Sequence, residues 1–227
     1  MPGDPQRGSF VTFEGLDGSG KTSHLKRVAV GLGALGVHHG VTHEPGGTPF
    51  GNALREVFLS PRHPAVDGVV EVLVVFASRR QHLAERIEPA LAAGRHVLCD
   101  RFTDSTIAYQ GYGRGVPLEA IDAVDRVATG RRRPDRTLLF DLPAEAARER
   151  GHRRRRDRSG GSDRLDAEDL DFYRRVRGGF LELAAAEPER FRVIDSAGEV
   201  EATYCQVRAA LADLFGELPA APAREVR

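Results

Sequence analysis

A glycine-rich turn between a β-rich run and a helical pattern constrains this chain more than any other feature. Ser9–Glu14 reads SFVTFE, and the turn after it, Gly15–Thr22, reads GLDGSGKT. From Lys21 to Leu35 apolar residues recur at helical spacing. Glycines let the backbone turn so that successive N–H groups converge, and the helix N-terminus adds partial positive charge. We therefore predict a strand, an anion-binding turn and a helix; the alternative is a turn that only connects the two elements.

The turn matches the pattern GxxxxGK[ST] of a P-loop, in the strand–turn–helix context that this pattern requires. A P-loop binds the phosphates of a nucleoside triphosphate. Lys21 is expected to bridge the β- and γ-phosphates, and the Thr22 hydroxyl to ligate Mg²⁺. The predicted ATP-binding residues are Gly15, Leu16, Asp17, Gly18, Ser19, Gly20, Lys21 and Thr22.

Four further β-rich runs follow, and helical patterns separate them. The runs read VHHGVTHE, RHVLCDR, RTLLFDL and FRVID, and the long helical patterns include residues 65–93 and 169–187. Short apolar strands that alternate with helices form a parallel sheet covered on both faces. We therefore predict an α/β chain of the three-layer P-loop NTPase type, with a five-stranded parallel sheet, helices on both faces and a short basic lid.

The chain is long enough for one domain, and two segments, the basic stretch and the C-terminal tail, differ from it in composition. The stretch RERGHRRRRDRSGGSDR, at about residues 148–164, is basic and rich in glycine, and we interpret it as the lid rather than as folded core. Residues 9–216 are expected to form the domain. Residues 1–8 are expected to be a flexible N-terminus and residues 217–227 a flexible C-terminal tail.

Charge and cysteine content narrow the classes of function. Lys plus Arg and Asp plus Glu both number 33, so the net charge of zero argues against a surface built for nucleic acid or anionic lipid. Cys99 and Cys205 lie far apart and give neither a disulfide framework nor metal-ligand spacing. Apolar runs end short of a membrane span, and no signal-peptide core precedes residue 10. We expect a cytoplasmic protein without membrane or nucleic-acid partners.

Three charged residues near the predicted phosphate site call for a role. Asp17 lies inside the turn, where a carboxylate beside phosphates is unfavourable unless it faces a metal, a hydroxyl or a cation; otherwise it is a solvated loop aspartate. Asp100 ends an apolar strand, where a carboxylate for Mg²⁺ is expected at the carboxyl edge of the sheet. Arg101 follows at once, and the alternative is a structural Asp–Arg ion pair.

Eight segments occur in a characteristic order: GLDGSGKT, THEPGGTPFG, ALREVFLS, ASRRQHLAERIEPALAAG, DRFTDSTIAYQGYGRG, RPDRTLLFDL, DRLDAEDLDFYRRVRGGFLELA and VIDSAGEVEAT. From about Phe10 to Phe215 they resemble the thymidylate kinase family of nucleoside monophosphate kinases. The resemblance implies ATP-dependent phosphorylation of dTMP to dTDP by in-line transfer, with residues 9–216 as the kinase domain. It also implies Mg²⁺ as cofactor, ATP and a pyrimidine deoxynucleoside monophosphate as substrates, and a homodimer.

The resemblance also implies roles for matching positions. Asp17 resembles the loop carboxylate that contacts the sugar 3′-hydroxyl and the metal environment, and Arg101 the residue that grips the acceptor phosphate. Arg79 resembles the arginine that binds the pyrimidine O4, Thr106 a side chain near N3, and Tyr109 an aromatic residue that resists a 2′-hydroxyl. The implied catalytic residues are Asp17, Lys21, Arg101, Arg154 and Arg156; the implied substrate-binding residues are Asp17, Glu44, Pro45, Phe76, Arg79, Arg101, Ser105, Thr106, Tyr109 and Gln110; the implied metal ligands are Thr22 and Asp100.

Two positions depart from the family. It usually places an aromatic residue four positions before the base-reading arginine and stacks thymine on it, whereas the residue four before Arg79 is Val75. Either Phe76 turns into the pocket, or Arg80 replaces Arg79, or the platform for the base is weaker. His43 stands where the family commonly has arginine, and histidine is mostly neutral above pH ~6.5, which leaves less positive charge near the acceptor phosphate.

The arginine run RRRRDR, residues 153–158, fits the resemblance as well. In this family the lid supplies positive charge to the transferring phosphoryl group when the P-loop has no arginine, and this P-loop has none. Arg154 and Arg156 are the candidates; the alternatives are a solvated basic loop or a nucleic-acid contact. Because the acceptor phosphate is already an anionic nucleophile, we assign no general base.

Three functions remain open at this point. The first is an ATP:dTMP phosphotransferase. The second is a kinase for another or a modified pyrimidine nucleoside monophosphate, which Val75 and His43 would permit. The third is a P-loop module that binds ATP or nucleic acid without phosphoryl transfer, against which the balanced charge argues.

Overall fold

The five predicted strands form one parallel sheet, which confirms the predicted fold class. The computed structural model describes residues 7–63, 65–156 and 164–220, without the side chains of residues 152, 154–156 and 166. The strand order is β2-β3-β1-β4-β5, so β1 is central and the turn after it opens at the middle of the carboxyl edge. The strands are β1 (Phe10–Gly15), β2 (His39–His43), β3 (His96–Asp100), β4 (Arg136–Asp141) and β5 (Phe191–Asp195).

Helices connect the strands and cover both faces of the sheet. The α-helices are α1 (Lys21–Ala34), α2 (Pro49–Leu59), α3 (Gly68–His82), α4 (Glu88–Ala92), α5 (Thr103–Thr106), α6 (Leu118–Thr129), α7 (Ala144–Arg156), α8 (Leu170–Ala186) and α9 (Val200–Phe215). Two π-helical segments, Leu83–Ile87 and Ile107–Gly113, continue α3 and α5, and a 3₁₀ turn spans Arg164–Ala167.

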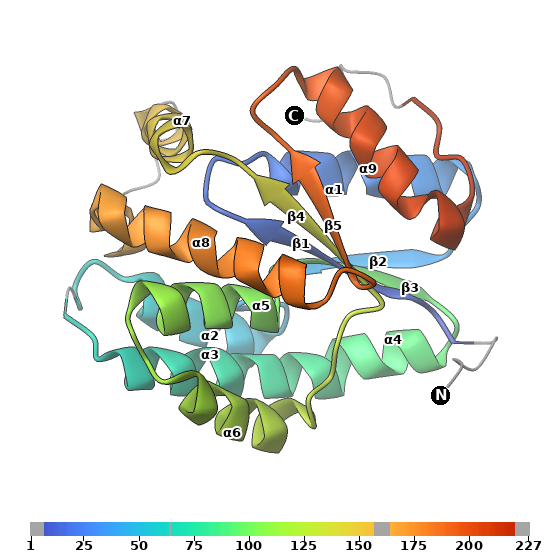
Figure 1. The fold of residues 1–227 in the computed structure, drawn as a ribbon. Helices are drawn as coiled ribbons and strands as arrows, with labels where there is room; N and C mark the ends of the chain where they lie inside the picture. Colours follow the sequence, from blue (N-terminus) through green and yellow to red (C-terminus); the bar gives the residue numbers. More distant parts are fainter. Residues whose placement is uncertain (1–6, 64, 157–163, 221–227) are drawn as a thin grey trace.

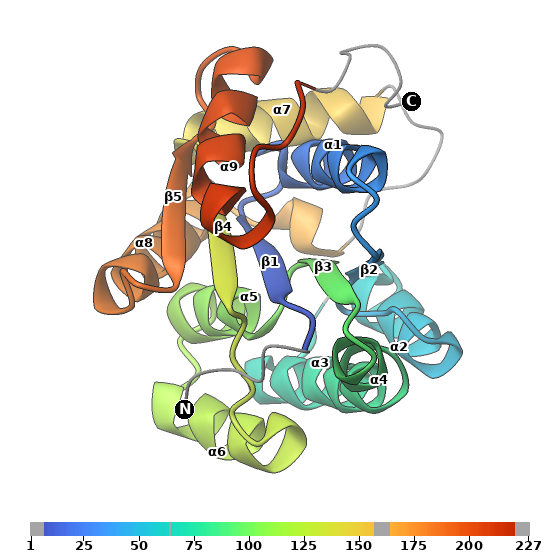
Figure 2. The same ribbon diagram turned by 90° about the vertical axis from the view of Figure 1, so that its right-hand side faces the viewer.

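Side chains along each strand point alternately to the two faces of the sheet, so the core forms two layers between the sheet and the helices on either side (Figure 1, Figure 2). Val11 and Phe13 of β1 face α1 and α9, where they pack with Leu25 and Tyr204. Phe10 points to the opposite face, which α3, α4, α5 and α8 cover, with α2 and α6 beyond them. Because β1 is buried on both sides, the turn that follows it starts from the most constrained part of the fold.

The helical pattern at 65–93 and the pattern at 169–187 correspond to α3–α4 and to α8. In the segment at about 148–164, which we interpret from the sequence as a lid, α7 continues as helix to Arg156. One i,i+4 ion pair, Arg153 to Glu149 at 2.9 Å, offsets some of the repulsion within the arginine run. The expected tail also begins as packed chain, since Leu218 is fully buried in the α1–α9 core. The expectations for residues 1–6, 157–163 and 221–227 lie outside the described residues.

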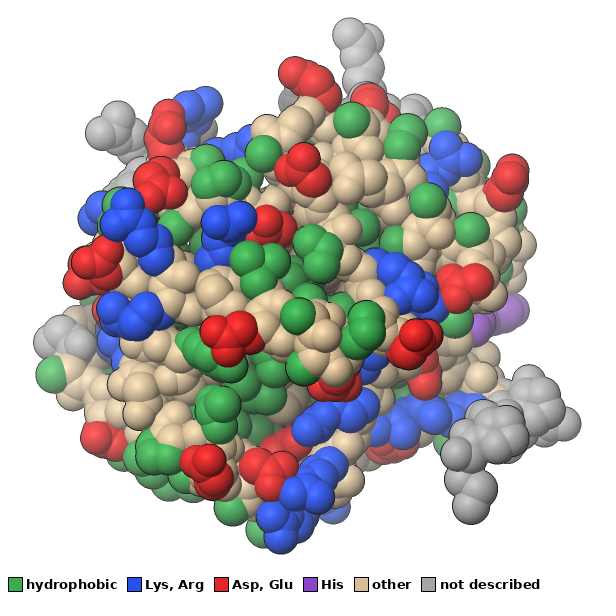
Figure 3. All heavy atoms as spheres, viewed as in Figure 1, with side chains coloured by type: hydrophobic (Ala, Val, Ile, Leu, Met, Phe, Trp, Pro, Cys, Tyr) green, Lys and Arg blue, Asp and Glu red, His purple; other side chains and the backbone are tan. Residues whose placement is uncertain are grey.

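Charges of both signs are interspersed on the face that Figure 3 presents, in keeping with the balanced composition. Within the described ranges, no helix has the length and apolar character that crossing a bilayer requires.

Candidate active site

The P-loop turn depends on glycines where backbone approaches backbone. Gly15 and Gly18 have φ of +133° and +87°, in a region that other residues rarely adopt. A Cβ on Gly15 would lie 2.5 Å from the carbonyl oxygen of Phe140, and a Cβ on Gly18 would lie 2.6 Å from that of Ala147 in α7. The turn is therefore shaped by β4 on one side and by the start of the basic helix on the other.

Lys21 lies inside this turn with only weak partners. Its ammonium is 3.4 Å from the carbonyl oxygen of Leu16 and 3.3 Å from Asp17 Oδ1. Burial lowers the pKa of Lys21, and the Arg101 guanidinium lowers it further, while Asp17 offsets part of the effect. Because both contacts are at the long end of hydrogen-bond lengths, an anion in the turn would be a better partner for this ammonium.

The two expected metal ligands lie side by side. The Thr22 hydroxyl at the start of α1 donates to Asp100 Oδ2 at the end of β3. The pairing of β1 with β3, in which Phe13 is opposite Asp100, brings the ends of these strands together. Among the described residues no group of three or more His, Cys, Asp or Glu side chains could hold a metal. Two oxygens fit Mg²⁺, which usually takes its other ligands from water and phosphate.

Arg101 connects the turn to the helix that follows it. Its NH1 donates to the carbonyl oxygen of Gly15 at 3.0 Å and to Ser105 Oγ at 2.9 Å, and its NH2 donates to Asp17 Oδ1 at 2.8 Å. Tyr109 lies beneath it, with the guanidinium carbon 5.0 Å from the ring centre. Asp17 thus pairs with Arg101, and its carboxylate, although partly exposed, faces two cations, Arg101 and Lys21.

Glu14, which the sequence reasoning missed, fixes the start of this helix. One of its oxygens accepts from the backbone N–H of Phe102 at 2.6 Å and the other from the Ser105 hydroxyl at 2.5 Å. Burial and then the charge of Asp104 raise the pKa of Glu14 to about 8. The available signal was a glutamate at the end of an otherwise apolar strand.

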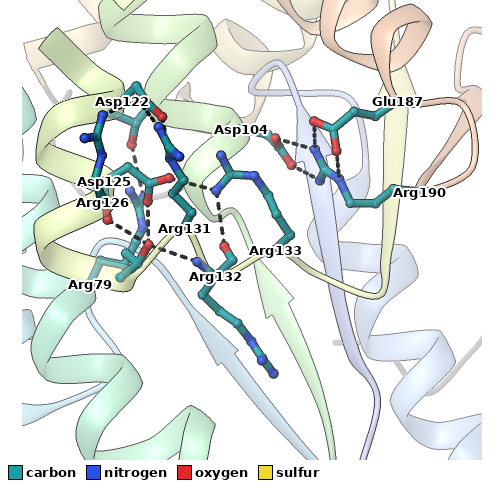
Figure 4. A network of polar contacts seen from close by, with 12 residues as sticks. Arg79, Asp104, Asp122, Asp125, Arg126, Arg131, Arg132, Arg133, Glu187 and Arg190 are labelled. Carbon is teal, nitrogen blue, oxygen red and sulfur yellow. Dashed lines mark hydrogen bonds and ion pairs between the residues drawn. The ribbon is translucent and has the colours of Figure 1, made fainter. Parts of the chain in front are cut away.

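Asp104, whose charge raises the pKa of Glu14, is itself bound by Arg190. Arg190 donates to its two oxygens at 2.6 and 3.0 Å and also pairs with Glu187 at 2.8 Å (Figure 4). These contacts tie α5 to the segment between α8 and β5, so the helix that carries the site residues is held from behind.

A pocket lies between the turn, α2, α3 and the π-helical segment after α5. Nine of the ten implied substrate-binding residues line it, Phe76 being the exception. It also contains residues outside the implied substrate-binding set. The nine are Asp17, Glu44, Pro45, Arg79, Arg101, Ser105, Thr106, Tyr109 and Gln110; the additional lining residues are Arg55, Phe58, Leu59, Val75, Phe102 and Leu165.

Phe76 is turned away from the pocket. Its ring is buried beside Val72 and Ile121, and the Arg79 guanidinium lies 4.6 Å from the ring centre. Val75 lines the pocket instead, and Arg80 is exposed outside it. Of the three alternatives, Arg79 therefore remains the pocket arginine, and Val75 gives it no aromatic platform. A shift of one residue turns a helical side chain by about 100°.

Arg79 is buried, and one nitrogen of its guanidinium group has no hydrogen-bond partner. Its Nε donates to Glu44 Oε2 at 2.6 Å and its NH2 to Thr106 Oγ1 at 3.0 Å, whereas its NH1 is buried with no hydrogen-bond partner. His82 Nδ1 lies 3.0 Å from the other oxygen of Glu44. A buried donor without a partner is costly, and this NH1 is an unsatisfied donor on a residue that lines the pocket.

Tyr109 is a rigid wall of the same pocket. Its ring packs edge-on against Phe172 and Phe180, with centroids 6.1 and 6.2 Å away. Burial raises the pKa of its hydroxyl above the usual value, so the group stays protonated.

A second cleft adjoins the first and contains the P-loop side chains. Lys21, Thr22 and Asp100 line it, together with His43 and Arg55. Burial and then the Arg55 guanidinium lower the pKa of His43, so His43 is neutral near pH 7. Arg55, on α2, lines both clefts and donates to the carbonyl oxygen of Pro45 at 2.9 Å. It was present in the segment ALREVFLS, but no chemical signal in the sequence distinguished it from a surface arginine.

The side chains of Arg154 and Arg156, the implied lid arginines, lie outside the described residues. Arg150, one and two turns earlier on α7, donates to the carbonyl oxygens of Ser196 and Ala197 at 2.9 and 3.2 Å. The helix is thereby attached to the loop between β5 and α9.

Comparisons with known proteins agree with this geometry. A sequence model of the family described as Thymidylate kinase matches residues 13–207. The thymidylate kinase of Geobacter sp. (strain M21) is 44% identical over 221 residues, 97% of this chain and 98% of that protein. That of Pseudomonas syringae pv. syringae (strain B728a) is 46% identical over 211 residues, 93% of this chain and 96% of that protein. A crystal structure of thymidylate kinase from Ehrlichia chaffeensis matches with a TM-score of 0.72 at 32% identity, covering 90% of this chain and 98% of that one. The resemblance seen in the sequence is confirmed, and this chain belongs to the thymidylate kinase family.

Proposed function

We propose that this chain transfers the γ-phosphoryl group of ATP to dTMP, the activity after which its family is named. One observation carries the proposal: the P-loop and a pocket for a second ligand meet at Asp17 and Arg101, which line both clefts. A donor phosphate in the turn and an acceptor phosphate in the pocket would therefore face each other.

On the donor side, the amides of residues 15–22 and the Lys21 ammonium bind the ATP phosphates. Thr22 and Asp100 would hold Mg²⁺, and the metal would supply charge neutralisation at the phosphates. Lys21 exchanges its long contacts to Leu16 and Asp17 for phosphate oxygens. Arg154 and Arg156 complete the donor site from a lid that comprises residues 148–164.

On the acceptor side, Arg101 and Arg55 bind the phosphate of dTMP. The unpartnered NH1 of Arg79 donates to O4 of the base, and Thr106 and Glu44 fix that guanidinium. Tyr109 packs where a 2′-hydroxyl would stand and so favours deoxyribose. Alignment, charge neutralisation and exclusion of water then account for the chemistry without a general base.

We further propose a cytoplasmic homodimer without nucleic-acid partners. Exposed apolar side chains on the neighbouring helices α2 and α3 support the dimer; they include Phe50, Val57, Val69, Val70 and Leu73. Two free cysteines fit a reducing compartment. Sedimentation velocity tests the assembly, and a monomer at micromolar concentration would contradict it.

The activity is tested by coupled ADP release with dTMP, dUMP, UMP, dCMP and a 5-modified pyrimidine monophosphate as separate acceptors. We expect dTMP to have the highest kcat/KM. Turnover of another pyrimidine nucleotide without turnover of dTMP would contradict the assignment of the base. ADP release that no monophosphate stimulates would contradict phosphoryl transfer to a small molecule.

A further inference from the structure

A buried carboxylate, Glu71, holds one end of the Gln110 side chain beside the acceptor pocket. Glu71 lies in the first turn of α3 and is fully buried. Gln110 lines the pocket, and its Nε2 donates to Glu71 Oε2 at 2.8 Å. A carboxylate only accepts hydrogen bonds, so it fixes which way the amide faces: the NH₂ end must point to Glu71.

The second oxygen of Glu71 is bound by two guanidinium groups. Arg164 NH1 donates to Oε1, and Arg114 Nε lies 3.2 Å from the same atom. Arg164 is itself buried, and its Nε donates to the carbonyl oxygen of Phe58 at 3.2 Å. Arg114 Nε also reaches Oε2, at 3.5 Å, but Gln110 Nε2 is the nearer donor to that oxygen, at 2.8 Å. These contacts keep Glu71 in its acceptor role, with Arg164 on Oε1 and Gln110 on Oε2.

We infer that Glu71 sets the base preference of this chain through Gln110. With its NH₂ bound to Glu71, the Gln110 amide turns its carbonyl oxygen towards the pocket. Arg79 NH1, buried without a partner, supplies a donor in the same pocket. A donor and an acceptor together complement the carbonyl oxygen and N3–H of thymine or uracil. Cytosine offers the reverse pair, an amino group and a bare N3.

Glu71 is therefore a positioning residue, which acts on the substrate only through Gln110. The inference rests on the proposed function, because it takes the pocket to be the site of a pyrimidine monophosphate. Turnover of dTMP by the unaltered protein tests that function. The ratio of kcat/KM for dTMP to that for dCMP, compared among variants, tests the role of Glu71 separately.

The decisive variant is Glu71→Gln. The carbonyl oxygen of the new amide takes the place of Oε1, because Arg164 NH1 there can only donate and Arg114 Nε is nearer to Oε1 (3.2 Å) than to Oε2 (3.5 Å). The new NH₂ group therefore takes the place of Oε2 and faces Gln110. Gln110 then turns over and presents NH₂ to the pocket, where it opposes the N3–H of thymine and suits the N3 of cytosine. We expect the dTMP/dCMP ratio to fall about tenfold or more, since a buried donor is left facing a donor. An unchanged ratio in the folded variant would overturn the inference.

Glu168→Gln is the matched control. Glu168 pairs with Arg114 NH2 at 2.7 Å, and Gln110 donates to Glu71 instead. This variant therefore weakens the same arginine network without turning the amide, and we expect the ratio to stay within about twofold of its original value. A fall equal to that of Glu71→Gln would assign the effect to general disruption and overturn the inference.

The exchange Glu71→Gln with Gln110→Glu keeps the experiment informative if the single variant does not fold. It retains one carboxylate and one amide in the same two places. The carboxylate at position 110 accepts from the amide at position 71 and turns its other oxygen to the pocket. We expect the preference for dTMP over dCMP to be preserved, and a preference reversed in favour of dCMP would contradict the mechanism.

Discussion

The buried pair of Arg79 and Glu44 gives a prediction with a large effect on stability. Both side chains are about 1% exposed, and Arg79 Nε lies 2.6 Å from Glu44 Oε2. Removing Arg79 leaves the Glu44 carboxylate buried with His82 beside it, and breaking a buried ion pair in this way costs about 3–5 kcal/mol. For a chain of this size each kcal/mol lowers Tm by about 2–4 °C, so Arg79→Met is expected to lower Tm by about 6–20 °C.

The assay is a double-mutant cycle in urea. Glu44→Gln also leaves one charge without its partner, whereas the double variant Arg79→Met with Glu44→Gln removes both charges, so most of the loss should be recovered. We expect a coupling energy of about 2 kcal/mol or more. Arg80→Met, at the next and exposed position of α3, is the control and should change stability by no more than about 0.5 kcal/mol. Losses that simply add, or an Arg79→Met variant as stable as the control, would refute the reasoning.

Three further outcomes are expected. Lys21→Ala should lower kcat by about 10²-fold or more without lowering Tm, because it removes a cation whose burial is itself unfavourable; turnover near the original rate would exclude its role at the phosphates. Tyr109→Ala should narrow the ratio of kcat/KM between deoxy- and ribonucleotide acceptors, whereas Tyr109→Phe keeps the ring and should keep the ratio; equal ratios in both variants would place the discrimination elsewhere. Glu14 binds its proton more tightly in the folded chain, so its contribution to stability is complete below pH 4.5 and is lost as pH rises through about 8. The urea midpoint should therefore decrease less between pH 6 and pH 8.5 in Glu14→Gln than in the unaltered chain. Equal decreases in both proteins would rule out Glu14 as the source of this pH dependence.

Much of the fold was predictable because its strands are short apolar runs with a glycine turn or charged residues at their ends. The P-loop and its flanking elements followed from local spacing alone. The helix α7 was harder to predict from the sequence, because a run of arginines is typical of a solvated loop. What stabilises it is partly tertiary: Gly18 leaves room for the Ala147 carbonyl group, and Arg150 reaches the loop after β5.

The site was predictable in outline, but not the direction in which each side chain points. On α3 the sequence resemblance implied Phe76 as a pocket residue, whereas Val75 lines the pocket, because packing on the opposite side of a helix decides which side chains face a site. Glu14 and Arg164 became functional candidates only through partners that lie 88 to 93 positions away along the chain. No local pattern reports contacts at that separation.

The backbone of Arg101 has φ of +71°, in the left-handed region. This conformation costs an arginine about 1–2 kcal/mol more free energy than it costs a glycine. Selection for heat resistance alone would thus favour Arg101→Gly. That change would remove a side chain that reaches Gly15, Asp17 and Ser105 together. Stabilising substitutions should accordingly be sought at positions other than residue 101. At residue 101 the native backbone conformation is less stable than the fold would allow.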